Sequence, residues 1–322
     1  MATLRNNIGK DAARAMDLLQ RGEVVAIPTE TVYGLAVNAF DADAVLRVFE
    51  IKQRPHFDPL IVHIGRMEQL PEVVTHVPPQ ARSLMDRFWP GPLTLVLPKQ
   101  SRVPDIVTSG LDTVAVRMPA HPLALELLRS LDFPLAAPSA NPFGYVSPTT
   151  AQHVADQLGD KVQYILDGGP CSVGVESTII GFVPQAVLYR TGGMPLEEIE
   201  ALIGNLTPDP SPKERRELVR APGMLLSHYA PHKPVIVGDV PALMDIHQGK
   251  RIGVISFSRE HGAAINEVLS PSGELHEAAR DLFAALRRLD GSNVDLILAE
   301  VFPEAGLGRA INDRLRRAAT PA

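Results

Sequence analysis

Short apolar runs alternate with segments of helically spaced apolar residues along the chain as far as Arg190. The apolar runs predict buried strands, at residues 24–27, 60–64, 93–97, 113–118, 135–137, 162–166, 177–182 and 186–190. The helical spacing predicts helices at residues 12–19, 42–52, 80–89, 121–130 and from Ser147 to about residue 158. Because the two kinds of segment alternate without a strict strand–helix–strand rhythm, we expect an α/β fold with a mixed sheet flanked by helices.

A proline-rich, charged segment interrupts this pattern from Thr207 onward. It reads TPDPSPKERRE, has no apolar periodicity and is typical of a linker. Later apolar runs lie at residues 235–237, 252–257 and 294–298, and later helical patterns at 275–289 and 310–319. These predict a second, smaller α/β domain. The expected division is a first domain at residues 1–205, a linker at 206–231 and a C-terminal domain at 232–322.

The composition narrows the class of protein. The 322 residues carry a formal net charge of -6, which argues against nucleic-acid binding through overall charge. The single cysteine, Cys171, excludes an internal disulfide and leaves no cysteine cluster for zinc. The N-terminal sequence MATLRNNIGK lacks the apolar core of a signal peptide, and no run approaches the about 20 apolar residues of a membrane span. We therefore expect a cytoplasmic protein without membrane contact.

Polar side chains directly follow the apolar run at residues 24–27. The sequence PTETVYG, ending at Gly34, is typical of a buried strand that delivers polar groups to the open edge of a sheet. Cations also stand in or beside apolar segments, at Lys52, Arg54, Arg117 and Arg190. Any one of them is most simply a structural ion pair, because buried charges are nearly always paired. Several of them near hydroxyl and amide donors favour a phosphate or carboxylate site. The donors are Ser139, Asn141, Ser147, Thr149 and Ser177.

Other motifs carry less weight on their own. Residues 169–174 read GPCSVG, but Val175 and Glu176 stand where a P-loop requires lysine and a hydroxyl, so we expect no P-loop. His63, taken alone, is more typical of a core histidine than of a binding residue. The Ser147 segment, taken alone, is equally typical of a helix cap and of a phosphate-binding turn.

Four segments, taken in order, resemble the landmarks of the YrdC-like family. They read PTETVYGL, KQRP followed by PLIVH, APSAN followed by SPTT, and VESTII followed by LYR. Two more, PGMLLSHYAP and GLGRAINDRLRRAA, resemble the longer branch of that family, the L-threonylcarbamoyladenylate synthases, which has an extra C-terminal domain. The resemblance covers nearly the whole chain. It implies a YrdC-like twisted, mixed sheet flanked by helices and a smaller, Rossmann-like C-terminal α/β domain.

The resemblance also implies an activity. Such an enzyme makes L-threonylcarbamoyl-AMP from L-threonine, bicarbonate or CO2, and ATP, and releases pyrophosphate, with Mg2+ arriving on the ATP. A tRNA threonylcarbamoyl transferase complex would then use the product, and weak direct contact with tRNA is a further implied property. The residues implied for L-threonine are Thr31, His63, Arg117, Ala137 and Ser177. Those implied for ATP are Lys52, Arg54, Asp58, Thr113, Ser139, Asn141, Ser147, Arg190 and Tyr229.

The physical chemistry agrees with most of this assignment. Arg117 suits a two-point grip on the carboxylate of threonine. Lys52, Arg54 and Arg117 would stabilise charge during transfer. We expect no metal ligand from protein side chains and no covalent enzyme intermediate. The sequence identifies no general base. Tyr229 lies in the predicted linker, so its assignment to ATP implies that the linker folds back over the pocket as a lid.

Two positions depart from the family pattern. Gln53 stands where the family often has glycine, a change expected to be tolerated. Thr191 follows Arg190 where the family usually has proline, which leaves the shape of that turn open.

Two other functions remain as alternatives. A YrdC-like domain with a concave positive surface could be an RNA-binding module, although the acidic chain with 5% aromatic residues does not favour it. Carbamoyl transfer from carbamoyl phosphate occurs in a related domain of hydrogenase-maturation proteins. Those proteins carry zinc-finger modules, which one cysteine excludes here.

Overall fold

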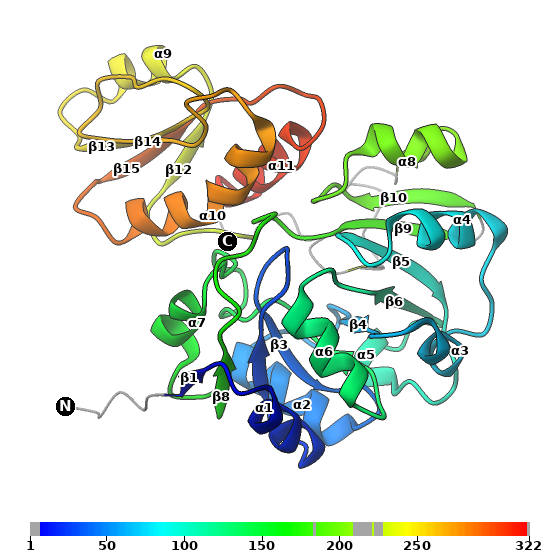
Figure 1. Cartoon of the computed structure of the whole chain (residues 1–322). Helices are drawn as coiled ribbons and strands as arrows, with labels where there is room; N and C mark the ends of the chain where they lie inside the picture. Colours follow the sequence, from blue (N-terminus) through cyan, green and yellow to red (C-terminus); the bar gives the residue numbers. More distant parts are fainter. Residues whose placement is uncertain (1–6, 183–184, 209–220, 222–227, 321–322) are drawn as a thin grey trace.

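The computed structural model describes residues 7–182, 185–208, 221 and 228–320, and Figure 1 shows them as two α/β units. A large sheet with its helices forms the first unit, and a small sheet with its helices forms the second. Helices α10 (Leu275–Asp290) and α11 (Gly308–Ala318) lie on the side of the small sheet that faces the first unit (Figure 1). Within the described residues, no helix is long and apolar enough to cross a membrane.

The large sheet has eleven strands in the order β1-β8-β2-β3-β7-β4-β6-β5-β9-β10-β11. These strands are β1 (Ile8–Gly9), β2 (Val25–Ile27), β3 (Gly34–Asn38), β4 (Ile61–His63), β5 (Leu93–Pro98), β6 (Thr113–Arg117), β7 (Leu135–Ala136), β8 (Tyr164–Leu166), β9 (Thr178–Phe182), β10 (Ala186–Arg190) and β11 (Thr207–Pro208). Parallel and antiparallel pairs are mixed, as the sequence predicts. The parallel pair β4 and β6 sets His63 directly opposite Arg117.

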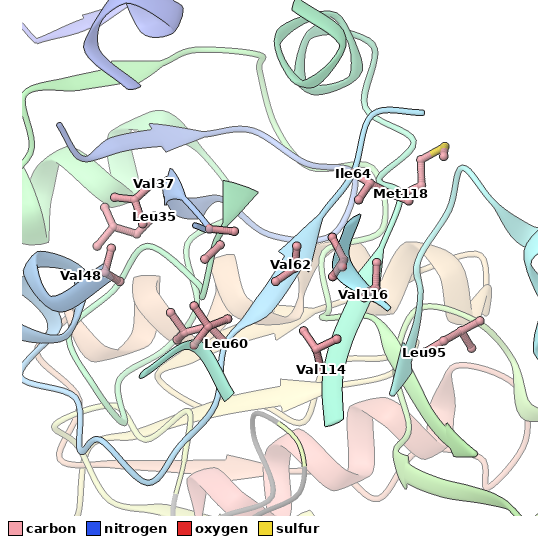
Figure 2. Packing of buried hydrophobic residues seen from close by; sticks show 14 of the residues in the cluster. Leu35, Val37, Val48, Leu60, Val62, Ile64, Leu95, Val114, Val116 and Met118 are labelled. Carbon is pink, nitrogen blue, oxygen red and sulfur yellow. The ribbon is translucent and has the colours of Figure 1, made fainter. Parts of the chain in front are cut away.

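Helices cover both faces of this sheet. They are α1 (Ala12–Gln20), α2 (Ala42–Lys52), α3 (Leu70–Val73), α4 (Pro79–Phe88), α5 (Asp105–Thr108), α6 (Pro122–Ser130), α7 (Ala151–Leu158) and α8 (Leu196–Ile203), with a 3₁₀ turn at Met67–Gln69. Alternation along β3 sends Leu35 and Val37 to the face packed by Val48 of α2, as Figure 2 shows. Ala36 points to the opposite face and joins the core that contains Leu19 of α1 and Leu127 of α6.

The small sheet is entirely parallel, in the order β12-β15-β13-β14. Its strands are β12 (Val235–Val237), β13 (Ile252–Ser256), β14 (Ile265–Val268) and β15 (Leu296–Ala299), and its third helix is α9 (Val240–Ile246). One face packs against α9 through residues such as Leu298, and the other packs against α10 and α11 through residues such as Ile297. Helices on both faces of a parallel sheet give the Rossmann-like arrangement expected for this domain.

Most predicted elements occur within a residue or two of their expected bounds, and α2 has the expected bounds. Several elements escaped prediction: the short strands β1 and β11, the strands β3 and β14, and the helices α3, α5, α8 and α9. The strand β3 follows the polar turn at once, so its short apolar stretch gave no separate signal. The strand β14 is partly exposed along its whole length. The helices α8 and α9 are only eight and seven residues long, so their helically spaced apolar residues, such as Leu196 and Ile199, were overlooked. The cap of α7 is also not Ser147: Thr150 caps it, accepting a hydrogen bond from the N–H of His153 at 3.2 Å.

The predicted linker at residues 206–231 is described only at its two ends and at Ala221. Its first residues join the large sheet, because Thr207 and Pro208 pair with β10 as the strand β11. Residues 209–220 and 222–227 lie outside the described residues. Ala221 packs with Ile61 and Ala115 of the central strands. The division of the chain at residues 205 and 231 stays a prediction.

Candidate active site

A hollow that is open to solvent lies where several strands of the large sheet begin or end. Its walls come from segments far apart in sequence: the turn after β2, the ends of β4, β6 and β10, the segment after β7, the segment before β9, and two residues that precede the C-terminal domain. The lining residues are Thr29, Thr31, Val32, Gly34, Arg54, Ile61, His63, Arg117, Ala137, Pro138, Ser139, Glu176, Ser177, Arg190, His228 and Tyr229.

Arg117 is the buried cation at the end of β6. Its Nη1 donates a hydrogen bond to Thr31 Oγ1 at 2.8 Å, and its Nε donates to the carbonyl of Gly91 at 3.1 Å. Its Nη2 lies 2.6 Å from Glu30 Oε1 in an ion pair that is almost fully buried. Thr31 and Glu30 belong to the turn after β2, which Thr29 stabilises. The hydroxyl of Thr29 lies 2.8 Å from that of Thr31 and donates to the carbonyl of Val32 at 2.7 Å. The guanidinium is therefore oriented by fixed partners on several sides.

His63 lies beside Arg117 because β4 and β6 run parallel in register. Burial, together with the nearby positive charge of Arg117, lowers the pKa of His63 to about 3. Its Nδ1 lies 3.2 Å from the carbonyl oxygen of Ile61. The imidazole is consequently neutral near pH 7, so it can act as a hydrogen-bonding group without adding a positive charge to the hollow.

Ser177, just before β9, also lines the hollow. Its hydroxyl lies 2.7 Å from that of Thr94, and Nη2 of Arg190 donates to the same hydroxyl at 3.2 Å. Arg190 also donates to the carbonyl of Ser177 from Nε at 3.1 Å. Ala137, from the segment after β7, donates its N–H to Ile61 at 3.0 Å. All five residues implied for threonine thus line one hollow.

The residues implied for ATP fall into three groups. Arg54, Ser139, Arg190 and Tyr229 line the hollow directly. Lys52, Asp58, Asn141 and Ser147 lie behind these residues, and each contacts a lining residue or its segment. Thr113 opens β6, at the other end of that strand from Arg117, and does not line the hollow. Its contact with ATP stays a prediction.

Two buried cations stand at the end of α2. Lys52 donates from Nζ to the carbonyl of Ser139 at 2.5 Å and also to the carbonyl of Asn141. Burial, reinforced by the charge of Arg54, pushes the pKa of Lys52 well below its usual value. Arg54 pairs with Asp58 at 2.8 Å and donates to the carbonyl of Pro59 at 2.9 Å.

Gln53, between these two cations, is the residue after the last turn of α2. It adopts a left-handed conformation with φ 53° and ψ 42°. That conformation strains most residues and suits glycine. The glycine that the family often carries here therefore has a physical reason.

Tyr229 brings the segment before the C-terminal domain to the hollow, as its predicted role requires. It is buried in a left-handed conformation with φ 65°. Its ring packs 5.5 Å from the ring of Phe283 in α10 and 4.2 Å from that of His228. Burial and the surrounding cations, Arg54 first among them, hold the pKa of His228 well below its usual value. Most of the predicted lid lies outside the described residues.

Sequence reasoning assigned no role to three residues at or beside the hollow: Glu176 and His228 line it, and Glu30 pairs with the lining residue Arg117. Each is a buried, ionisable side chain. Glu30 stood within a quoted motif, and its surroundings of hydroxyls and apolar residues were the available signal. In the sequence, Glu176 stood out only as a residue that does not fit a P-loop. Its pairing with Arg314 could not be predicted, because Arg314 belongs to the other domain.

Carboxylates at and behind the hollow are all paired with arginines. Glu30 pairs with Arg117, Asp58 with Arg54, and Glu176 with Arg314 at 2.9 Å. Within the parts of the chain that the structure describes, no group of three or more His, Cys, Asp or Glu side chains could hold a metal ion. The hollow is accordingly rich in cations and hydroxyls, a donor set that suits a polyanionic ligand.

Comparison with known proteins agrees with this geometry. Residues 17–192 match the family model described as "Telomere recombination" (Sua5, YciO and YrdC), and residues 194–320 match the model described as "Threonylcarbamoyl-AMP synthase, C-terminal domain". The threonylcarbamoyl-AMP synthase of Pyrococcus abyssi is 47% identical, over 94% of this chain and 92% of its own length. That of Bacillus subtilis is 44% identical, over 95% of this chain and 92% of its own length.

A solved structure is similar over nearly the same extent. The crystal structure of Pyrococcus abyssi Sua5 complexed with L-threonine matches with a TM-score of 0.90 and 46% identity, over 96% of this chain and 94% of that chain. Both domain models, the full-length relatives and the fold therefore agree with one another. The chain belongs to the threonylcarbamoyl-AMP synthase family, in the branch that carries the additional C-terminal domain.

Proposed function

We propose that this enzyme makes L-threonylcarbamoyl-AMP from L-threonine, bicarbonate or CO2, and ATP, with release of pyrophosphate. The observation that carries the proposal is the convergence of Arg117, Thr31, His63, Ala137 and Ser177 on one hollow whose adjoining wall holds Arg54, Ser139 and Arg190. One side suits an amino acid and the other a polyphosphate. The relative that was solved with L-threonine supports the first assignment.

Arg117 would hold the carboxylate of threonine, because a fixed guanidinium offers parallel N–H groups to two oxygens. The neutral imidazole of His63 and the hydroxyl of Ser177 would contact the polar groups of the same substrate. The cations around the hollow would lower the pKa of the threonine amine, since each disfavours a second positive charge nearby. A neutral amine has the lone pair that the next step requires.

Two bond-forming steps follow. The amine nitrogen attacks the carbon of CO2 and loses a proton, which gives a carbamate. A carbamate oxygen then attacks the α-phosphorus of ATP, and the bond from that phosphorus to the pyrophosphate oxygen breaks. Both partners are anionic, so the task of Arg54 and Arg190 would be charge neutralisation and in-line placement. Lys52 would share this task because phosphates in the hollow would raise its lowered pKa and favour its charged form. Burial raises the pKa of Cys171 above its usual value, so that thiol is no nucleophile for a covalent route.

Magnesium would enter as part of the Mg–ATP substrate. Glu30, Asp58 and Glu176 are each ion-paired with an arginine, so none offers a carboxylate that a cation could use without breaking a buried pair. Phosphate oxygens satisfy Mg2+ with few or no protein ligands. The product would pass to a transferase complex that modifies tRNA, and any direct contact with tRNA would be weak.

The test is pyrophosphate release from Mg–ATP, with threonine and bicarbonate each omitted in turn. Release that requires both substrates is the expected result. Ser139→Ala should then impair ATP binding, and Arg117→Ala should impair threonine binding. Release that needs neither substrate, or no release from a folded sample, would refute the proposal. Salt-dependent tRNA binding without turnover, or turnover of carbamoyl phosphate, would favour one of the two alternative functions.

A further inference from the structure

Arg314 of α11 is a fully buried arginine that reaches from the C-terminal domain to the wall of the hollow. Its Nε donates to Glu176 Oε2 at 2.9 Å, across 138 residues of sequence. Its Nη1 donates to the carbonyl of Thr191 at 2.9 Å and to Asp313 Oδ2 at 2.8 Å. The guanidinium is thus fixed by partners from both domains.

The carboxylate that Arg314 binds belongs to the hollow. Glu176 lines it, and its Oε1 accepts a hydrogen bond from the hydroxyl of Ser147 at 2.6 Å. The carbonyl of Glu176 accepts from the N–H of Gly193 at 2.8 Å. Gly192 lies so close to this segment that a Cβ there would meet the carbonyl oxygen of Glu176 at 2.3 Å. Glu176 and the turn after Arg190 therefore form one packed unit.

Arg314 also contacts the tyrosine assigned to ATP. Its guanidinium carbon lies 5.2 Å from the centroid of the Tyr229 ring, a cation–π distance. The same ring also packs against Phe283, which belongs to the same domain as Arg314. The C-terminal domain thus reaches the hollow through a cation and an aromatic contact.

The charges decide what this arrangement does. An ionised Glu176 would repel the phosphates of a nucleotide in the hollow, and burial would strengthen that repulsion. Arg314 and Arg190 oppose the effect of burial and hold the pKa of Glu176 below its usual value, so the carboxylate stays charged. Arg314 is in direct contact with this carboxylate.

We infer that Arg314 is a positioning residue for ATP, which neutralises the Glu176 carboxylate and fixes it away from the phosphates. The inference rests on the proposed function, because it requires that the hollow binds ATP. A purely structural interdomain ion pair would stabilise the fold without changing the affinity for ATP. The two cases differ in what removal of each charge does.

The experiment compares the full-length wild type with Arg314→Met, Arg314→Lys, Glu176→Gln and the double variant Glu176→Gln/Arg314→Met. Calorimetry measures the affinity of each for Mg–ATP and, separately, for L-threonine, and thermal unfolding reports the folded fraction. The matched control is Arg316→Met, because Arg316 lies on the same helix and forms an exposed pair with Glu304 at 2.6 Å.

Arg314→Met should weaken ATP binding by about tenfold or more, since truncating one partner of a buried pair leaves the other charge unpaired. Threonine affinity should change by less than about twofold, because Arg117 is not touched. The double variant should recover ATP affinity to within about threefold of wild type, and Arg314→Lys should lie between. Arg316→Met should match the wild type.

The inference is overturned if folded Arg314→Met binds ATP as the wild type does. It is equally overturned if the double variant, with both charges removed, still binds ATP tenfold more weakly than the wild type. The second comparison decides the matter even where the single variant does not fold. A wild type that binds no ATP would instead refute the proposed function, which separates the two failures.

Discussion

Replacement of Arg117 by methionine tests two roles of this residue: its buried ion pair with Glu30, which affects the free energy of unfolding, and its proposed contact with threonine, which affects the affinity for that substrate. The two side chains are 4% and 7% exposed and lie 2.6 Å apart. Arg102 and Glu72 form a pair of similar length, 2.5 Å, but are 58% and 36% exposed. These two pairs thus place the same chemistry in a buried and in a solvated setting.

The expected magnitudes follow from this difference. Arg117→Met leaves the Glu30 carboxylate buried and unpaired, which should cost about 3–5 kcal/mol of unfolding free energy. Arg102→Met should cost no more than about 1 kcal/mol. Arg117→Met should also remove at least two charged hydrogen bonds to threonine. At about 1.5–3 kcal/mol each, their loss should weaken threonine binding about a hundredfold or more.

The double variant Glu30→Gln/Arg117→Met separates the two effects. It removes both charges, so urea unfolding should show most of the lost stability restored, while calorimetry should still detect little threonine binding. If the double variant binds threonine with wild-type affinity, Arg117 does not hold the carboxylate. If Arg117→Met is no less stable than Arg102→Met, the burial argument is wrong.

Three further predictions concern single positions. Gln53→Gly should raise the unfolding free energy by about 0.5–1 kcal/mol, because it relieves a left-handed residue; a lower urea midpoint would contradict this. The pKa of His63 is about 3 in the folded chain and about 6.5 in the unfolded chain. Below about pH 6.5 the unfolded chain binds a proton that the folded chain does not, so the free energy of unfolding falls as the pH falls towards 3. Between pH 6 and 4 the wild type should lose about 1.4 kcal/mol per pH unit more than His63→Gln in urea titrations, and equal slopes would refute the shift. Tyr229→Ala should weaken ATP binding about tenfold by loss of a stacking and packing surface, and unchanged calorimetric affinity would exclude its role.

The sequence predicted the parts of the site that depend on local pattern. His63 and Arg117 each lie one residue before the end of a predicted apolar strand, and the structure pairs these two strands in parallel, which brings the two side chains together. The β2 turn could be recognised for the same reason, since its hydroxyls follow a buried strand directly. Both inferences need only the period of the strand and the point at which it stops.

Long-range pairing could not be predicted in this way. Glu176 forms a buried ion pair with Arg314, and the sequence around neither residue indicates its partner. The left-handed conformation of Gln53 was likewise hidden, because a glutamine gives no sign of it where a glycine would. The cap of α7 moved from Ser147 to Thr150 because Ser147 instead donates to Glu176, a contact that only the fold creates.

The pairing of Glu176 with Arg314 has a consequence for the order in which the nascent chain becomes active. The two residues are 138 positions apart, so at about 5–20 residues per second the ribosome needs roughly 7–28 s to add the second after the first. During that interval the emerging first domain would present an uncompensated carboxylate at its nucleotide wall. Competence for ATP would therefore arise late in translation, when the second domain docks, and an abandoned fragment would bind the nucleotide poorly.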